Sequence, residues 1–335
     1  MKHIFVYNPI AGAGKVQKTE LPRILAAVKD AGVDYEIHRT TNAGEATSWV
    51  RRRLENAPPE DLLRFYAVGG DGTLGEVLNG LYGFENAELA CVPAGSGNDF
   101  IRNFGNASEG KENNPFLRID AQLQGEAISV DVMEYQFLHS GDDSVGAEAP
   151  ENRGAVRYAI NMLNIGFDAN VVSHTQRLKK TRILRGTAAY ITGVVTELAS
   201  YRFSRAQIKI GSNQPFDTTI LLAGVGNGCF SGGGFKGLPS ARVDDGLLDV
   251  YVIKPITRID FLKLVGKYHD GTLEDDPRIV GRLFQWRTKQ VTFTPVGPLT
   301  LAVDGEPATT TEPFRIRLAE KQVRFSVPAG AFSIV

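Results

Sequence analysis

The chain has 335 residues, of which 42% are hydrophobic and 22% charged, and its formal net charge is −1. This length suits two domains with separate cores, and the near-zero charge excludes an overall basic field that would recruit nucleic acid or an anionic membrane. The two cysteines cannot form a disulfide framework, no apolar run approaches the length of a bilayer span, and the N-terminus does not resemble a signal peptide, so we expect a cytoplasmic protein with at most peripheral membrane contact.

Strand-like and helix-like segments alternate from residue 1 to about residue 125. Apolar strand patterns occupy residues 3–7, 33–40, 62–68 and 88–93. Helical patterns occupy residues 19–31, 43–57 and 73–82. This alternation predicts an α/β domain over residues 1–125, with a parallel sheet and helices on both of its faces.

The pattern changes at residue 126, where short strand-like segments and turns begin to follow one another. It predicts a mainly antiparallel β-sandwich over residues 126–335, with the extreme C-terminus packing back on the first domain. Helical patterns interrupt this half at residues 186–201 and 258–271, and the polar stretch 140–154 predicts an exposed hairpin loop.

Three predicted strands of the first domain end in glycine-rich turns. These turns are Asn8–Lys15, Gly69–Thr73 and Pro93–Asp99. Glycines let backbone N–H groups approach a phosphate closely, and ligands collect beyond the carboxyl ends of parallel strands. Three such turns on one sheet favour a nucleotide site over plain turns. Neither a Walker A loop nor a dinucleotide fingerprint is present, because Lys15 is followed by Val16 and the third fingerprint glycine is missing.

The second turn also contains the only carboxylate among its glycines, Asp71. A carboxylate beside phosphates usually needs a metal ion between them, so Asp71 indicates a metal-assisted site. Thr73, with Glu76 three residues later, has the spacing of a helix capping box.

The motifs "NPIAGAGK" (8–15), "GGDGTLGEV" (69–77) and "PAGSGNDF" (93–100) resemble, in order and spacing, those of the diacylglycerol kinase catalytic-domain family. These are soluble bacterial lipid kinases, related to sphingosine and ceramide kinases and more distantly to NAD kinases. The resemblance continues through "NIGFDANV" (164–171), "PSARVDDGLLDVYVI" (239–253) and "AVDGEP" (302–307). The chain departs from the family at Gly75, where asparagine is common, and at Ala94 and Ser96, although Ser96 keeps a hydroxyl.

The resemblance implies an ATP-dependent lipid kinase that transfers the γ-phosphate to a lipid hydroxyl, with diacylglycerol as acceptor and phosphatidic acid as product. Asp71 would meet a catalytic Mg²⁺ held with the ATP phosphates, while Asn8 and Asn98 brace the loops. The resemblance implies these ATP-binding residues: Asn8, Thr40, Gly69, Gly70, Asp71, Gly72, Thr73, Leu74, Gly75, Ser96 and Asn98.

The same resemblance places the catalytic base at Asp304 or Glu306, without choosing between them, and makes Asp131 its support. For Asp131 the alternative is an edge-strand aspartate that faces water.

A second, structural Mg²⁺ would take the Asp245 carboxylate and the backbone carbonyls of Arg242 and Leu247, and its alternative is a plain Asp-Asp-Gly turn.

The expected partner is a lipid substrate presented at a membrane surface, with no nucleic acid, and a homodimer is compatible with the sequence. The basic segment 177–185 and the apolar stretch after it suit peripheral membrane contact, or equally a core helix with a solvated lead-in. Two rival functions remain: an NAD kinase-like phosphotransferase, and a non-catalytic nucleotide-binding regulator on the same scaffold.

Overall fold

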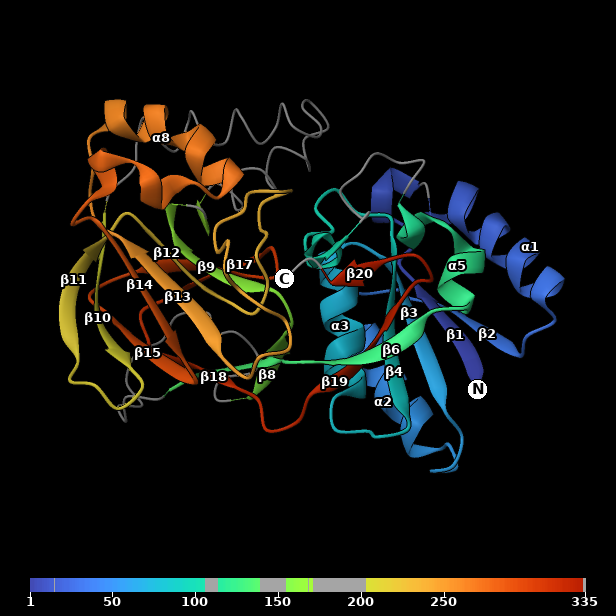
Figure 1. Ribbon diagram of the computed structural model, residues 1–335. Coiled ribbons are helices and arrows are strands. Elements are labelled where there is room, and N and C mark those ends of the chain that lie inside the picture. Colours follow the sequence, from blue (N-terminus) through green and yellow to red (C-terminus); the bar gives the residue numbers. More distant parts are fainter. Residues whose placement is uncertain (15, 106–113, 139–154, 168, 171–202, 334–335) are drawn as a thin grey trace. The chain divides into compact units, whose positions relative to one another are not determined.

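A computed structural model describes residues 1–14, 16–105, 114–138, 155–167, 169–170 and 203–333 (Figure 1). The chain forms two compact units. The first contains Met1–Val132 and Glu320–Val335, and the second contains Met133–Ala319. The predicted helix at 186–201, the predicted loop at 140–154 and the basic segment 177–185 lie outside the described residues.

The first unit is built on a six-stranded sheet of order β2-β1-β3-β4-β19-β6. The five strands from β2 to β19 run parallel, and β6 pairs antiparallel with β19 at the edge. These strands are β1 (Lys2–Tyr7), β2 (Tyr35–Arg39), β3 (Leu63–Gly69), β4 (Ala87–Pro93), β6 (Glu126–Val130) and β19 (Val323–Val327). The predicted parallel sheet is therefore confirmed, and β3 and β4 are buried along their whole length, as strands covered on both faces must be.

Helices cover both faces of this sheet, as predicted (Figure 1). Ile24 and Val28 of α1 pack on Phe5 and Tyr66 on one face, in a cluster that also contains Ile119 of α5. On the other face, α2 and α3 pack closely on each other. The helices are α1 (Leu21–Ala31), α2 (Glu45–Glu55), α3 (Asp71–Leu81) and α5 (Ile119–Leu123), with short helical turns η1 (Ala11–Gly14), η2 (Val16–Glu20), η3 (Phe100–Asn103) and η4 (Pro115–Leu117).

The boundary between the two units lies after Val132 rather than after residue 125. The strand at 126–130 joins the first sheet because β19 returns from the end of the chain and offers it a partner, with Val323 opposite Val130 and Val327 opposite Glu126. By lying between β4 and β6, β19 also covers the edge of β4, which would otherwise expose unpaired backbone groups. A two-residue strand pair of β20 (Phe332–Ser333) with β5 (Phe104–Gly105) also joins the C-terminal segment to the first unit.

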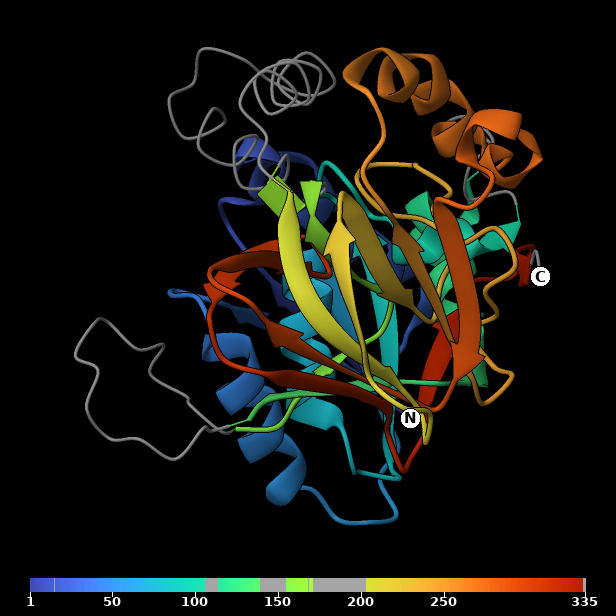
Figure 2. The same ribbon diagram turned by 90° about the vertical axis from the view of Figure 1, so that its left-hand side faces the viewer.

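The second unit consists of two six-stranded sheets whose pairings are all antiparallel (Figure 2). Their orders are β11-β10-β15-β18-β7-β8 and β14-β13-β12-β9-β16-β17. One core joins residues of both sheets, among them Phe293 and Phe314 from the first and Val250 and Leu301 from the second. The predicted β-sandwich is therefore confirmed. The strands are β7 (Met133–Phe137), β8 (Arg157–Ala159), β9 (Met162–Gly166), β10 (Ser204–Ile210), β11 (Phe216–Ile220), β12 (Leu222–Gly226), β13 (Leu248–Ile253), β14 (Leu283–Thr288), β15 (Gln290–Pro295), β16 (Leu299–Val303), β17 (Glu306–Thr310) and β18 (Phe314–Leu318).

The helix predicted at 258–271 is α8 (Arg258–Asp270). The Thr257 side chain accepts a hydrogen bond from the Asp260 backbone N–H, and Gly271 ends the helix in the left-handed conformation. These are the cap residues that helix termini favour, which explains why the sequence located this helix accurately.

A buried histidine makes the stability of the first unit pH-dependent. His3 lies in β1, with its Nδ1 atom 2.8 Å from the Tyr66 hydroxyl. Burial, followed by the positive charge of Arg64, lowers the pKa of His3 from 6.5 to about 4. Between these two values the unfolded chain binds a proton that the folded chain does not. Stability is therefore full above pH 6.5 and is lost as the pH falls toward 4, by about 3 kcal/mol in total.

We expect His3→Asn, which keeps an amide near the Tyr66 hydroxyl, to lose less stability on acidification than the parent chain. Urea unfolding of both proteins at about pH 7 and about pH 4.5 measures the difference. An equal loss in the two proteins would show that other groups control acid stability.

Candidate active site

Four strand-end turns lie along one edge of the first sheet. Because β1, β2, β3 and β4 are parallel, the residues that follow them start from the same edge. These residues are Asn8, Thr40, Gly70 and Ala94. The strand order reverses at β1, which has β2 on one side and β3 on the other. Such a reversal is where open α/β sheets bind ligands. The three glycine turns are therefore brought together as predicted, and a fourth turn at residues 40–44 joins them.

The second and third glycine turns are in direct backbone contact. The Gly69 carbonyl accepts hydrogen bonds from the N–H groups of Ala94 (2.7 Å) and Gly95 (3.0 Å). A Cβ atom on Gly95 would lie 2.4 Å from the Gly70 Cα atom, closer than non-bonded atoms can come. Glycine at position 95 is thus required by the approach of the two turns, quite apart from any ligand.

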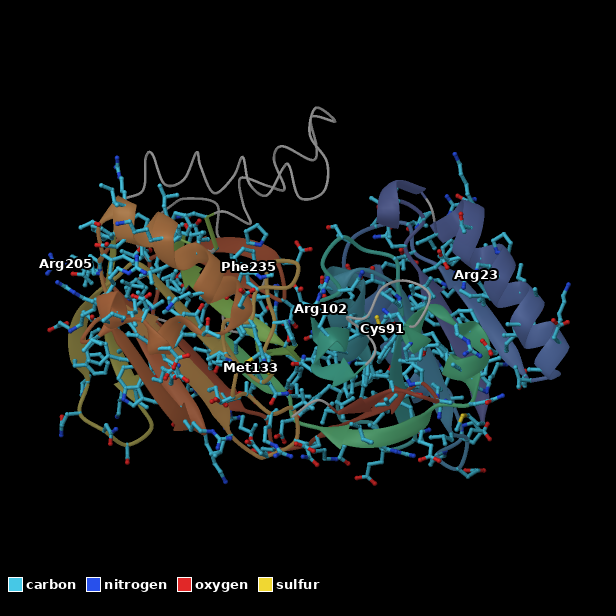
Figure 3. All side chains as sticks on the ribbon, turned by 45° about the horizontal axis from the view of Figure 1, so that its top comes forward. Arg23, Cys91, Arg102, Met133, Arg205 and Phe235 are labelled. Carbon is cyan, nitrogen blue, oxygen red and sulfur yellow. The ribbon has the colours of Figure 1, made fainter. Side chains whose placement is uncertain are left out.

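Asp71 ties the third turn to the start of α3. The backbone N–H groups of Asn98 and Asp99 donate to its Oδ2 and Oδ1 atoms at 2.8 and 2.9 Å. Burial raises the pKa of Asp71, while those two N–H groups and the charge of Arg102 oppose the rise. The guanidinium of Arg102 also lies 3.4 Å from the Asp99 carboxylate (Figure 3). Sequence analysis missed this bracing role, and a carboxylate among glycines was the one signal for it.

The start of α3 differs from the predicted capping box. The helix begins at Asp71 with Gly70 as the N-cap, and no side chain caps it. Thr73 lies inside the first turn, packed so tightly on Gly69 that a Cβ atom there would lie 2.3 Å from the Thr73 hydroxyl oxygen. Glu76 instead accepts a hydrogen bond from the Ala46 N–H at the start of α2 (3.2 Å). The first turn of α3 therefore lies directly at the site edge, where helix N–H groups suit a phosphate.

Two asparagines brace their own turns, as predicted. Asn98 has the left-handed φ of 52°, and its side chain makes two hydrogen bonds with the Gly95 backbone, to the N–H (3.2 Å) and from the carbonyl side to O (3.0 Å). The Asn8 Oδ1 atom accepts from the Ile10 N–H at 3.0 Å. Asparagine tolerates left-handed backbone and bonds to nearby backbone groups, so these turns form without a ligand.

The fourth turn contains Thr40, whose buried hydroxyl donates to the Tyr7 carbonyl at 3.3 Å. Beside it, Glu45 accepts from the N–H and hydroxyl of Thr41, at 2.5 and 2.6 Å. These bonds lower the pKa of Glu45 to about 2. The organising role of Glu45 was not predicted, although its place four residues after Thr41 was a usable signal. Ser96, at the tip of the third turn, is exposed.

The second unit separates the two candidate bases. Asp304 and Gly305 form the two-residue turn between β16 and β17, both with positive φ, which is the usual hairpin chemistry. The Asp304 carboxylate accepts three backbone N–H groups, from Ile160 (2.9 Å), Asn161 (3.1 Å) and Met162 (2.9 Å). Glu306, in contrast, is exposed at the start of β17.

Asp131 is buried in the short connection between β6 and β7, with 3% of its surface exposed. It accepts a hydrogen bond from the Gln322 side chain at 2.8 Å. The alternative of an edge-strand aspartate facing water is therefore wrong. Asp131 belongs to the first unit, whereas Asp304 and Glu306 belong to the second.

The predicted structural metal site is organised differently from the family pattern. Asp245 Oδ1 accepts the Leu247 N–H at 3.1 Å, and Asp245 Oδ2 is paired with the guanidinium of Arg287. Arg242 lies beside Asp244, with 3.7 Å between Nε and Oδ1. Within the described ranges no group of three or more His, Cys, Asp or Glu side chains could hold a metal. As arranged, the residues at 242–247 do not fit a metal ion, because a cationic side chain already occupies the carboxylate oxygen that would bind it.

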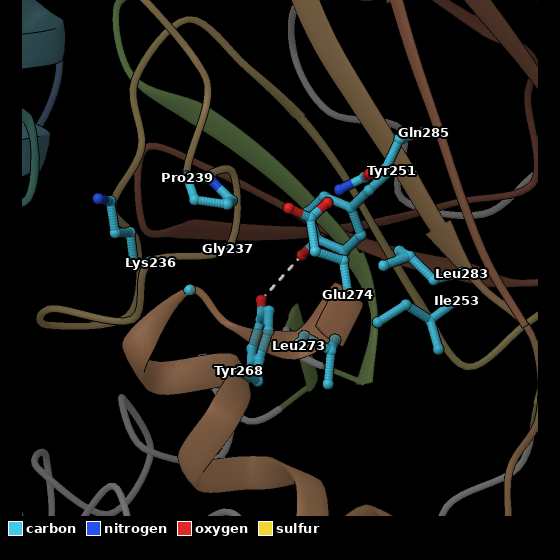
Figure 4. Close-up of a pocket in the computed structure, with 11 residues that line it drawn as sticks. Lys236, Gly237, Pro239, Tyr251, Ile253, Tyr268, Leu273, Glu274, Leu283 and Gln285 are labelled. Atoms are coloured by element: carbon cyan, nitrogen blue, oxygen red, sulfur yellow. Dashed lines mark hydrogen bonds between the residues drawn. The ribbon is translucent and has the colours of Figure 1, made fainter. Parts of the chain in front are cut away.

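Two small pockets lie beneath α8 in the second unit. One is lined by Lys236, Tyr251, Tyr268 and Glu274, with the two tyrosine hydroxyls 2.8 Å apart (Figure 4). The other is apolar and includes Phe261 among its lining residues. Each has room for about one water molecule, so neither can enclose a lipid chain as it stands. No helix in the part of the chain that the structure describes is long and apolar enough to cross a membrane.

Comparison with known proteins identifies both halves. Residues 2–135 match the diacylglycerol kinase catalytic domain, and residues 161–326 match the YegS C-terminal NAD kinase beta sandwich-like domain. A crystal structure of a diacylglycerol kinase from Bacillus anthracis covers 98% of this chain and 97% of its own, with a TM-score of 0.64 at 22% identity, which supports the fold.

Relatives of similar length agree with these matches. "Diacylglycerol kinase" of Staphylococcus carnosus is 25% identical over 90% of this chain and 87% of its own length. "Probable lipid kinase YegS-like" of Pseudomonas aeruginosa is 30% identical over 94% of this chain and 89% of its own length. With both domain models matched in order and this identity over almost the whole length, the chain belongs to the family of YegS-like lipid kinases that carry the diacylglycerol kinase catalytic domain.

Proposed function

We propose that the protein is an ATP-dependent kinase that phosphorylates the hydroxyl of diacylglycerol and so produces phosphatidic acid. The observation that carries this proposal is the set of four turns at one sheet edge, two of them in backbone contact through Gly70 and Gly95. Phosphoryl transfer requires mainly positioning and charge stabilisation, and a rigid surface of backbone N–H groups supplies both.

ATP is proposed to lie along the second and third turns, with its phosphates at the N-terminus of α3. Asp71, Asn98 and the backbone contact keep these turns in place before the nucleotide arrives. Asp71 accepts one backbone N–H on each oxygen, which uses two of the roughly four lone-pair sites of a carboxylate. It can therefore also face a Mg²⁺ bound with the phosphates, whose charge would offset that of the transferring group.

Glu306 is the proposed base. In the reaction the acceptor hydroxyl oxygen bonds to the γ-phosphorus, the bond from that phosphorus to the β-phosphate bridging oxygen breaks, and the hydroxyl proton passes to the Glu306 carboxylate. Asp304 suits this task less, because three backbone N–H groups already use its lone pairs. We assign Asp304 to holding residues 160–162 and the 304–305 turn, and Asp131 to a supporting role.

Diacylglycerol is proposed as the acceptor because relatives of this length carry the name diacylglycerol kinase. The test is to incubate the protein with labelled ATP and Mg²⁺, and to offer diacylglycerol, a sphingoid base and a prenyl alcohol in mixed micelles, and NAD in solution. We expect labelled phosphatidic acid to form fastest. Label in another lipid would change the acceptor, label in NADP would favour the NAD kinase alternative, and nucleotide binding without any product would favour a regulator.

A further inference from the structure

An arginine on a neighbouring strand reaches the turn at residues 242–247. Arg287 lies in β14 directly opposite Asp249 of β13 in the antiparallel register. Opposite residues of such a pair place their side chains on the same face of the sheet. From there the Arg287 guanidinium contacts the Asp245 carboxylate and lies 3.6 Å from Asp249 Oδ1. One cationic side chain therefore serves two carboxylates on either side of the start of β13.

Both carboxylates depend on that positive charge. Asp249 is 7% exposed, and its Oδ2 atom has no hydrogen-bond partner. Burial raises the pKa of Asp249, the Arg287 charge lowers it, and the charge of Asp245 raises it again. A buried carboxylate with a like charge nearby is unfavourable without a compensating cation. Arg287 is the cation that the structure supplies.

A guanidinium and a divalent cation compete for the same oxygen. Mg²⁺ requires a nearly octahedral shell of oxygens at about 2.1 Å, and it tolerates no cationic group in that shell. A guanidinium instead presents N–H donors in a planar fork, which can bond neighbouring carboxylates together. The pairing of Arg287 with Asp245 Oδ2 leaves no place for the ion that the family resemblance implies.

We infer that Arg287 replaces a structural metal ion at the 242–247 turn, so that this chain holds the turn with its own guanidinium and needs no divalent cation there. The inference concerns the second unit alone and does not rest on the proposed kinase reaction. It also has a converse: without Arg287, Asp245 and Asp249 would form a pair of carboxylates with no compensating charge, which is a rudimentary cation site.

The test compares thermal unfolding of the nucleotide-free parent chain and of Arg287→Met, in EDTA and in millimolar Mg²⁺ or Mn²⁺. We expect the parent Tm to be the same in both conditions. Arg287→Met should unfold at a Tm lower by about 3 °C or more in EDTA, and the divalent cation should restore part of that loss. Electron paramagnetic resonance of Mn²⁺ should show a bound ion in Arg287→Met and none in the double variant with Asp245→Asn.

Two further variants make the result specific. Arg287→Lys keeps the charge and should remain insensitive to the metal. Arg205→Met makes the same chemical change at an exposed position of β10 (labelled in Figure 3) and should behave as the parent in every condition.

The inference is overturned if the parent chain binds Mn²⁺, or gains Tm in Mg²⁺, in a manner that Asp245→Asn abolishes. It is equally overturned if Arg287→Met keeps the parent Tm and shows no response to metal. If Arg287→Met does not fold well enough to measure, the comparison of the parent with Asp245→Asn still decides whether an ion binds at this turn.

Discussion

Replacing Glu306 by glutamine is expected to lower kcat for lipid phosphorylation by about 10²–10⁴-fold while leaving Tm and ATP affinity unchanged. Glutamine has nearly the shape of glutamate but cannot accept the hydroxyl proton. Glu306 is exposed at the start of β17, so its replacement leaves no buried group unpaired. The measurements are steady-state kinetics with diacylglycerol micelles, calorimetric titration with ATP and thermal unfolding.

Asp304→Asn is the informative comparison, because it lies two positions away and plays a different part. Its carboxylate accepts three backbone N–H groups, and an amide offers one acceptor oxygen in place of two. We expect Asp304→Asn to lower stability by about 1–3 kcal/mol as well as activity. An exposed glutamate elsewhere in the second unit, Glu274, gives a matched control as Glu274→Gln. Near-normal turnover in Glu306→Gln would place the base elsewhere.

Replacing Gly95 by alanine is expected to reduce kcat/KM for ATP by about 100-fold or more and to destabilise the first unit by about 1–3 kcal/mol. The added Cβ atom would lie 2.4 Å from the Gly70 Cα atom and 2.9 Å from the Asn98 side-chain oxygen. The backbone of one turn must therefore move, and the proposed phosphate-binding N–H groups move with it. Kinetics at varied ATP and urea unfolding measure the two effects.

Gly75→Ala is the matched control for this prediction. A Cβ atom on Gly75 would have no atom within 4 Å, and the residue lies inside α3. Alanine is favoured over glycine in a helix by up to about 1 kcal/mol, so this variant should be as stable as the parent or more so. If Gly95→Ala bound ATP with parental affinity, the contact between the two turns would not be what positions the nucleotide.

Local patterns in the sequence were sufficient to predict the elements that depend on local causes. The alternation of apolar strands with helices predicted the parallel sheet, because a strand buried on both faces must be apolar along its length. Thr257 and Gly271 marked the two ends of α8 through their cap preferences. The glycine turns announced a ligand site at the strand ends, because that edge is common to all parallel strands.

The roles of the site carboxylates depended on partners far away in the chain, and only the tertiary structure decided them. Asp304 bonds N–H groups that precede it by more than 140 residues, so the choice between Asp304 and Glu306 could not be made from their shared motif. Likewise, β6 belongs to the first unit because β19 returns to pair with it.

Asp245 and Arg287 illustrate the same limit. By itself, "VDDGLLDV" indicated either a turn or a metal site. The antiparallel pairing of β13 with β14 brought Arg287 to Asp245 and decided the charge that this carboxylate meets. The sequence alone thus determined the family, the two folds and the edge where the nucleotide turns gather, because these follow from local periodicity and motif order. The tertiary structure decided which carboxylate is bound by backbone, by a guanidinium or by neither, because strand pairing sets those contacts across long separations in the chain.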